Sequence, residues 1–269
     1  MSFPVKAVDC WINTMLGAPD KGADYLFQGL SERWTQGMSP DELIEDMDAH
    51  GVEKAILTSG YGPGDTVGWV KAAIKAYPDR LYGSHIVDPR EGMKAVRLVD
   101  DLVRNEGFRL VRMMAFMSQK PYDDAINYPI YAKCAELNVP ISLNVGIPGP
   151  REPSRCQDPF PLDEICYFFP ELTVIMAHGG EPWADLCVKL MLKWPNLFYM
   201  TSAFAPKRIP PAILQYLNSR GADRIMWASD YPVLTFERCL KDISGMKFRD
   251  DETLEKFLSG NARRVILDR

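Results

Sequence analysis

The chain has 269 residues, of which 46% are hydrophobic and 25% are charged, and its formal net charge is −5. This composition is typical of a globular protein, and the length is sufficient for one large α/β domain. No basic run is present and no apolar run approaches the roughly 18 residues of a membrane span, so neither nucleic acid nor a membrane is an expected partner.

The N-terminus and the cysteines indicate the compartment. Met1–Lys6 contains no long apolar stretch, so a signal peptide is not predicted. The six cysteines form no Cys-x-x-Cys pair, and several fall within apolar helical patterns. We therefore expect mostly buried, free thiols and a cytoplasmic protein.

Short apolar runs alternate with amphipathic segments along the whole chain. The apolar runs predict eight strands, at Ala7–Cys10, Ala55–Thr58, Leu81–Val87, Phe108–Met113, Pro140–Asn144, Thr173–Ala177, Leu197–Met200 and Ile225–Ala228. The amphipathic segments predict helices at Ser39–His50, Thr66–Tyr77, Gly92–Asn105, Asp124–Leu137, Leu162–Phe169, Trp183–Lys193, Pro210–Arg220 and Leu254–Ile266. This alternation, without a break in composition, predicts a single α/β domain over residues 1–269, a (β/α)8 TIM barrel.

The first of these helices has clear boundary signals. Ser39-Pro40-Asp41-Glu42 is a capping box in which proline occupies the first helical position. Gly51 follows His50 and suits the left-handed conformation that commonly ends a helix. A helix is therefore predicted between Ser39 and His50.

Two predicted loops are long. Thr14–Met38 follows the first strand, and Val145–Pro161 follows the fifth strand and carries Arg151 and Arg155. Loops that follow strands lie on the catalytic face of a (β/α)8 barrel. Both segments are interpreted either as a lid over a site or as ordinary surface loops.

Polar residues end two of the predicted strands. Thr173–Ala177 runs into His178-Gly179-Gly180, and Ile225–Ala228 runs into Ser229-Asp230-Tyr231-Pro232. The carboxyl ends of the strands build the active site of a barrel of this type. His178 and Asp230 are therefore the first candidates for catalysis.

Four segments resemble the amidohydrolase-related family, which includes aminocarboxymuconate-semialdehyde decarboxylase, resorcylate-type decarboxylases and dicarboxylate lactonases. They are Val8-Asp9-Cys10-Trp11-Ile12-Asn13, Ala177-His178-Gly179-Gly180, Ala228-Ser229-Asp230-Tyr231-Pro232 and Gly260-Asn261-Ala262-Arg263-Arg264. The resemblance covers nearly the whole chain, and its most specific part is Asn-Ala-x-Arg following Ser-Asp-x-Pro. It implies a TIM barrel that acts on small molecules.

The departures from the family pattern are concentrated at its metal site. The family usually has Asp-x-His-x-His after the first strand, whereas this chain has Trp11 and Asn13 at the two histidine positions and Asn144 where the fifth strand usually ends in histidine. A catalytic zinc normally needs three protein ligands, and indole and amide groups are poor substitutes. Cys10 is expected to point away from the face of Trp11 because side chains alternate along a strand. No tightly bound metal and no cofactor are therefore predicted.

Each catalytic candidate has a structural alternative. His178 either polarises a carbonyl and assists proton transfer, or is hydrogen-bonded at the barrel mouth without a chemical role. Asp230 is either a general base or the cap of a helix after Tyr231-Pro232. Asn13 and Asn144 are expected to offer hydrogen bonds to the substrate.

Further candidates are predicted to line the site. Arg112 is expected to point into the barrel, where it either binds a substrate carboxylate or pairs with Asp9. His85 either faces the substrate or is a core histidine. Aromatic residues near strand ends predict a pocket for a flat ligand, namely Trp11, Tyr61, Phe116, Trp183 and Tyr231.

The predicted function is metal-independent hydrolysis of a lactone, amide or similar bond in a carboxylated cyclic or aromatic small molecule. The alternatives are a non-oxidative decarboxylase of an aromatic or unsaturated acid, and a catalytically silent barrel that binds a ligand. The expected partner is the small-molecule substrate, and a homo-oligomer is possible. In the predicted site Asp230 and His178 are catalytic; the residues that bind the substrate are Arg112, Asn144, Asn13, Trp11, His85 and Tyr231.

Overall fold

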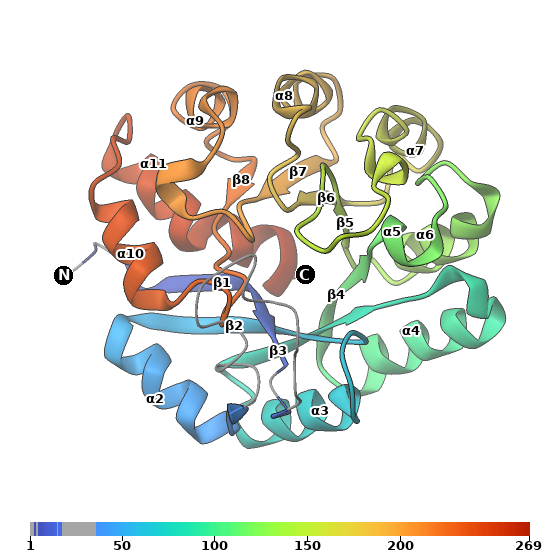
Figure 1. Cartoon of the computed structure of the whole chain (residues 1–269), viewed down its shortest axis with the longest axis horizontal. Helices are drawn as coiled ribbons and strands as arrows, with labels where there is room; N and C mark the ends of the chain where they lie inside the picture. The colour runs from blue at the N-terminus through green and yellow to red at the C-terminus, as the bar shows by residue number, and fades with distance from the viewer. Residues whose placement is uncertain (1–2, 4, 15, 18–35) are drawn as a thin grey trace.

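The structure is a computed structural model that describes residues 3, 5–14, 16–17 and 36–269. Eight parallel strands form one sheet in which each strand pairs with the next along the chain (Figure 1). They are β1 (Ala7–Asn13), β2 (Val52–Ser59), β3 (Leu81–Ile86), β4 (Phe108–Met113), β5 (Ile141–Asn144), β6 (Val174–Ala177), β7 (Leu197–Met200) and β8 (Ile225–Met226).

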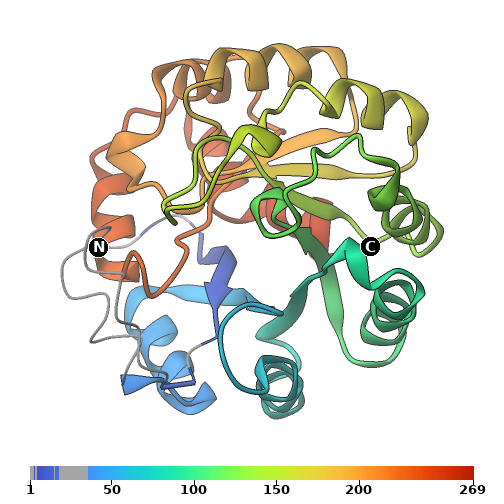
Figure 2. The same cartoon turned by 45° about the vertical axis from the view of Figure 1, so that its right-hand side comes forward.

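Helices surround this ring of strands, as two views of the molecule show (Figures 1 and 2). The α-helices are α2 (Pro40–His50), α3 (Thr66–Ala76), α4 (Met93–Asn105), α5 (Ala115–Ser118), α6 (Tyr128–Glu136), α7 (Leu162–Phe168), α8 (Ala184–Lys193), α9 (Pro211–Leu217), α10 (Phe236–Ser244) and α11 (Asp251–Glu255). Two π-helical segments, Lys256–Gly260 and Arg263–Leu267, continue from α11. The predicted TIM barrel is confirmed.

The capping signals of α2 also hold, whereas other boundaries differ. The Ser39 side chain accepts from Glu42 N, and Gly51 ends the helix with φ of 74°. β1 is longer than predicted and β8 shorter. The helix α10 was expected only as an undefined stretch after Pro232, and it begins after Thr235, which caps it.

The barrel closes between β1 and β8 through a carboxylate. Ile12 and Tyr231 form a parallel bridge, and Asn13 N donates to Tyr231 O at 2.8 Å. Asp9 accepts from the backbone N–H groups of Trp11 (2.9 Å) and Ser229 (3.0 Å), and also from the Ser229 hydroxyl. Asp9 is fully buried. Through these hydrogen bonds its side chain joins β1 to the segment that follows β8.

Side-chain alternation divides the buried apolar residues into two clusters, one inside the barrel and one between the strands and the helices. Cys10 and Trp11 both belong to the inner cluster, although they are adjacent. The pairing of β1 with β2 shifts register between Asp9 and Ile12, which interrupts the alternation. The expectation that Cys10 points away from the face of Trp11 is therefore wrong.

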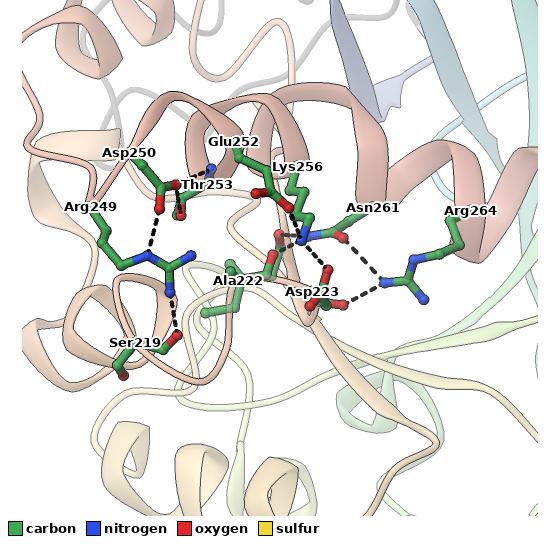
Figure 3. A network of polar contacts seen from close by, with 11 residues as sticks. Ser219, Ala222, Asp223, Arg249, Asp250, Glu252, Thr253, Lys256, Asn261 and Arg264 are labelled. Atoms are coloured by element: carbon green, nitrogen blue, oxygen red, sulfur yellow. Dashed lines mark hydrogen bonds and ion pairs between the residues drawn. The ribbon is translucent and has the colours of Figure 1, made fainter.

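The Asn-Ala-x-Arg motif supports the entry to β8. Asn261 donates its amide N–H groups to the carbonyl of Ala222 at 2.7 Å (Figure 3). It also donates to the carbonyl of Ile225 at 2.8 Å. Arg264 donates to Asp223 O at 2.6 Å, and Lys256 forms an ion pair with the Asp223 carboxylate at 2.8 Å. The motif is therefore structural, because it satisfies backbone carbonyls that would otherwise be unpaired.

The chain ends against the amino-terminal side of the barrel, away from the strand ends that build a site. Val265, Ile266 and Leu267 pack with the inner cluster. Arg269 donates to the hydroxyl of Thr173, which directly precedes β6, at 2.7 Å. This segment therefore covers the end of the barrel opposite the candidate site.

The two long loops differ in what the structure describes. Most of the predicted loop Thr14–Met38 lies outside the described residues, so the lid interpretation stays a prediction. The loop after β5 is tied to its surroundings, because Ile147 N donates to Glu181 O (2.8 Å) and Gly146 pairs with Gln157 through two hydrogen bonds. No helix within the described part of the chain combines the length and apolarity that a membrane crossing requires.

We predict that Asp9→Ala lowers the free energy of unfolding by roughly 2–4 kcal/mol, because it removes three buried hydrogen bonds and leaves donors unpaired. Asp88→Ala is the control, since Asp88 also accepts from a backbone N–H but caps a short surface helix. Its loss should cost only about 1 kcal/mol. Urea unfolding followed by circular dichroism measures both, and equal losses would contradict the closing role of Asp9.

Candidate active site

Side chains from four strand ends, those of β1, β6, β7 and β8, form one continuous set of contacts at the barrel mouth. Asn13 donates its amide to Asp230 Oδ1 at 2.8 Å and accepts from Trp11 Nε1 at 3.0 Å. The Trp11 ring lies 4.3 Å from the His178 ring, centroid to centroid. His178 in turn bonds Ser202 after β7. The structure therefore brings the two catalytic candidates into one cluster.

Both catalytic candidates have an unusual backbone. The φ angles of His178 and Asp230 are 66° and 64°, and that of Ala203 is 67°. Non-glycine residues rarely adopt this left-handed conformation, and such strain concentrates at functional sites. Three neighbouring strand ends therefore hold their residues in a costly conformation that re-aims the side chains.

Asp230 is buried and its charge is disfavoured. Burial raises the pKa of its carboxyl to about 7, against the opposing effects of the hydrogen bond from Asn13 and the charge of Arg112. Asp230 does not cap a helix, because α10 begins beyond it at Phe236 with Thr235 as its cap. A carboxyl with a pKa near 7 exchanges protons readily at neutral pH.

His178 is held neutral. Burial, together with the charge of Arg112, lowers the pKa of the imidazole to about 3. The Ser202 oxygen accepts from the backbone N–H of His178 (3.3 Å) and lies 2.7 Å from Nδ1. This arrangement favours a hydroxyl donating to Nδ1, which leaves the ring proton on Nε2 as a donor.

Arg112 lies inside the barrel, as predicted, but its contacts are with neutral groups. Its guanidinium donates to Ser84 Oγ (2.8 Å), Cys10 O (2.5 Å) and Ser142 Oγ (3.4 Å). Its centre is 3.7 Å from the centroid of the Trp11 ring. The ion pair with Asp9 is not formed, because the oxygens of Asp9 bond Trp11 and Ser229. Each guanidinium nitrogen already donates to a protein group. Arg112 therefore does not present the free pair of N–H groups that was expected to bind a substrate carboxylate.

Asn144 offers a hydrogen-bonding side chain without a partner. It alternates with Leu143, which belongs to the outer cluster, and shares its face with Ser142, which contacts Arg112 inside the barrel. Its Oδ1 is buried and accepts from no described residue. Buried amides are normally satisfied, so this oxygen is the clearest unfilled position for a ligand donor.

Two predicted substrate contacts lie elsewhere. The side chain of Ser84 points to Arg112, so the next residue, His85, lies on the opposite face of β3. The Nδ1 atom of His85 is 3.0 Å from Ser59 Oγ. It corresponds to the core-histidine alternative. The Tyr231 ring belongs to the outer cluster and stacks on Phe236 at 4.5 Å. Its backbone reaches the site, since its carbonyl accepts from Asn13 and its N–H donates to Ser229 Oγ.

The polar residues that the sequence argument missed are serines. Ser84 and Ser142 position Arg112, Ser202 positions His178, and Ser229 holds Asp9. Ser202 and Ser229 follow buried runs at strand ends, which is the signal that identified His178 and Asp230. Small hydroxyl residues carry no distinctive chemistry in a sequence, so their role emerges only from their contacts.

The donor set does not fit a divalent metal ion. Among residues 3, 5–14, 16–17 and 36–269, no group of three or more His, Cys, Asp or Glu side chains is arranged to hold one. Trp11 fills the space beside His178, and Asp230 Oδ1 is engaged by Asn13. Below Trp11 lies the positive charge of Arg112, which would repel a second cation.

Comparison with known proteins agrees with this geometry at the level of the family. A family model described as amidohydrolase matches residues 8–266. The chain belongs to the amidohydrolase family. The resemblance that rested on the strand-end motifs is therefore confirmed.

Solved structures with the same fold include an uncharacterised TIM-barrel protein from Bordetella bronchiseptica, 24% identical with a TM-score of 0.76 over 97% of this chain and 98% of that one. A 5-carboxyvanillate decarboxylase from Novosphingobium aromaticivorans, complexed with manganese, is 19% identical with a TM-score of 0.69 over 98% and 95%. A 2,6-dihydroxybenzoate decarboxylase from Rhizobium is 19% identical with a TM-score of 0.71 over 97% and 98%. At these identities the likeness shows the fold.

We predict that Ala203→Gly stabilises the protein by about 1 kcal/mol, because glycine adopts a positive φ without strain. Ala72→Gly is the control, since Ala72 lies exposed within α3, where glycine should destabilise by about 1 kcal/mol. Melting temperatures measured by differential scanning calorimetry should move in opposite directions. A lower melting temperature for Ala203→Gly would contradict strain at this strand end.

Proposed function

We propose that this amidohydrolase-family protein is a metal-independent, non-oxidative decarboxylase of a carboxylated cyclic or aromatic small molecule. The observation that carries the proposal is Asp230, a buried carboxyl with a pKa of about 7 that is bonded to Asn13 at the barrel mouth. Such a group is about half protonated at pH 7 and largely protonated below it. It can therefore act as an acid toward carbon.

The proposed step is a proton-for-carboxylate exchange. Asp230 donates its proton to the ring carbon that carries the carboxylate. The bond from that carbon to the carboxylate then breaks, its electron pair returns to the ring, and carbon dioxide leaves. Solvent reprotonates Asp230. The atoms and charges balance as one acid anion and one proton giving one neutral product and carbon dioxide.

The other residues have supporting roles in this proposal. His178, neutral with its proton on Nε2, donates a hydrogen bond to the substrate. Asn144 accepts one through its unpartnered Oδ1, and Trp11 presents an apolar wall. The structural neighbours that act on carboxyvanillate and dihydroxybenzoate support the same class of reaction for this chain.

Hydrolysis of a lactone or amide is the second candidate. It would use the deprotonated form of Asp230 to activate water, and the pKa of about 7 suits this role as well. It also needs donors for the developing oxyanion, since no metal is proposed. The amide of Asn13, the obvious donor, is engaged by Asp230 and by Tyr231 O, which ranks hydrolysis below decarboxylation.

The direction of the pH dependence separates the two reactions. We predict that kcat/KM for decarboxylation falls as pH rises through about 7, because the required acid form of Asp230 is lost. Hydrolysis would instead rise through the same pH. Aromatic acids and lactones are assayed from pH 5 to 9, with release of carbon dioxide and ring opening as the two readouts.

Asp230→Asn is the matched variant for this assay. It should lower the rate by about 100-fold or more and remove the inflection near pH 7, with little change in melting temperature. A variant that turns over at the wild-type rate would exclude Asp230 from the mechanism. Failure of the wild-type protein on every substrate, with ligand binding intact, would favour the silent barrel.

We also predict that Asn144→Leu weakens binding of salicylate by about tenfold while binding of benzoate changes little, because only salicylate has a hydroxyl to donate to Oδ1. Asn144→Asp retains an acceptor and should keep the preference for salicylate. Asn127→Leu is the control, since Asn127 is another buried amide with an unpartnered oxygen, located before α6. Isothermal titration calorimetry measures each affinity, and an unchanged ratio in Asn144→Leu would contradict this role.

A further inference from the structure

The buried guanidinium of Arg112 is the most unusual charge in the described part of the protein. Its side chain is fully buried, yet its polar contacts there are with two hydroxyls, a carbonyl and the sulfur of Met200. Buried charges are ordinarily paired with an opposite charge. Burial lowers the pKa of Arg112 to about 9, so the group remains cationic at neutral pH.

This charge is held rigidly at the centre of the barrel. Arg112 comes from β4, and its contacts come from four other strands: Ser84 of β3, Cys10 of β1, Ser142 of β5 and Met200 of β7. The Trp11 ring covers it at 3.7 Å. Its position is therefore set before any ligand binds, as electrostatic stabilisation requires.

The charge of Arg112 acts on the acid–base groups around it. Its field contributes to the pKa values of Asp9, Asp230 and His178. Burial of the two carboxyls raises the pKa of Asp9 to about 6 and that of Asp230 to about 7, so their negative charge is incomplete at neutral pH. Neither carboxylate contacts the guanidinium, since Asp9 bonds Trp11 and Ser229 and Asp230 bonds Asn13, so Arg112 has no ion-pair partner among the described residues.

We propose that Arg112 is the built-in cation of this site: it attracts the anionic group of the ligand through space, and it takes the place of a divalent metal ion and excludes one. The strand ends beside His178 and Asp230 carry Trp11, Asn13 and Asn144, none of which is a strong metal ligand, and the Trp11 ring covers the guanidinium. Arg112 is thus a positioning residue that acts through its charge. The inference rests on the proposed function only in taking the bound anion to be the substrate.

The first test compares an anionic probe with a neutral one. Salicylate and salicylamide have similar shapes, and isothermal titration calorimetry should show at least tenfold tighter binding of salicylate by the wild-type protein at pH 7.5. Arg112→Lys keeps the charge and should retain most of this preference. Arg112→Met should reduce it to about one, with folding verified by circular dichroism.

Arg109→Met is the matched control. Arg109 lies on the same strand but is exposed, so its loss should leave the preference unchanged. Equal binding of the two probes by wild-type protein would overturn the proposal without any variant. A preference that persists in folded Arg112→Met would also overturn it.

The second test measures manganese binding directly and does not require turnover. The double variant Trp11→His, Asn13→His introduces two imidazoles beside His178 and Asp230. With Arg112 present it should bind Mn²⁺ weakly, and adding Arg112→Met should tighten binding at least tenfold. Equal Mn²⁺ affinity with and without Arg112 would overturn the exclusion of a metal.

The two tests also distinguish this proposal from the proposed function. If salicylate binding and Mn²⁺ exclusion depend on Arg112 while no acid is decarboxylated, the built-in cation stands and the reaction is wrong. If neither probe binds the wild-type protein, the Mn²⁺ titration decides alone. Decarboxylation that is unaffected in folded Arg112→Met would leave the reaction standing and remove Arg112 from it.

Discussion

The contact between the Arg112 guanidinium and the Trp11 ring organises the candidate site. The ring centroid lies 3.7 Å from the centre of the guanidinium and 4.3 Å from the centroid of the His178 ring. Through its Nε1–H it also orients Asn13, which holds Asp230. The indole of Trp11 therefore contacts or orients Arg112, His178 and Asp230. The Trp11 ring covers the cation of Arg112 on one side. The two acid–base groups above it, His178 and Asp230, carry little charge.

The closure of the barrel makes this arrangement possible. Asp9 joins β1 to the segment after β8, and the register shift within β1 allows Trp11 to enter the interior beside Cys10. The same closure sets the positive φ of Asp230, whose backbone N–H donates to Trp11 O at 3.0 Å. Fold stability and site geometry thus depend on the same few contacts, which is why backbone strain at the strand ends is tolerated.

Much of this could be predicted from the sequence, for physical reasons. Alternating apolar and amphipathic segments favour a barrel, strand-end positions indicate His178 and Asp230, and the resemblance to the amidohydrolase-related family indicates Asn13 and Asn144. What could not be predicted depends on local irregularity. A regular strand would separate Cys10 from Trp11, and no periodicity reveals that β1 bulges there. Ser84 faces Arg112 inside the barrel, so alternation along β3 places His85 on the outer face of the strand. Which of the two residues faces inward is known only from the three-dimensional contacts.

The central claim is that the site works by proton transfer from a neutral carboxyl held near a fixed cation. Its most direct test is a ¹³C NMR titration of the Asp230 carboxyl in the wild-type protein, assigned by comparison with Asp230→Asn. The structure predicts a midpoint near pH 7, because burial outweighs the hydrogen bond from Asn13 and the charge of Arg112. A midpoint near 4, the ordinary value for aspartate, would contradict the account, since Asp230 would then be ionised at neutral pH and could not act as the proton donor.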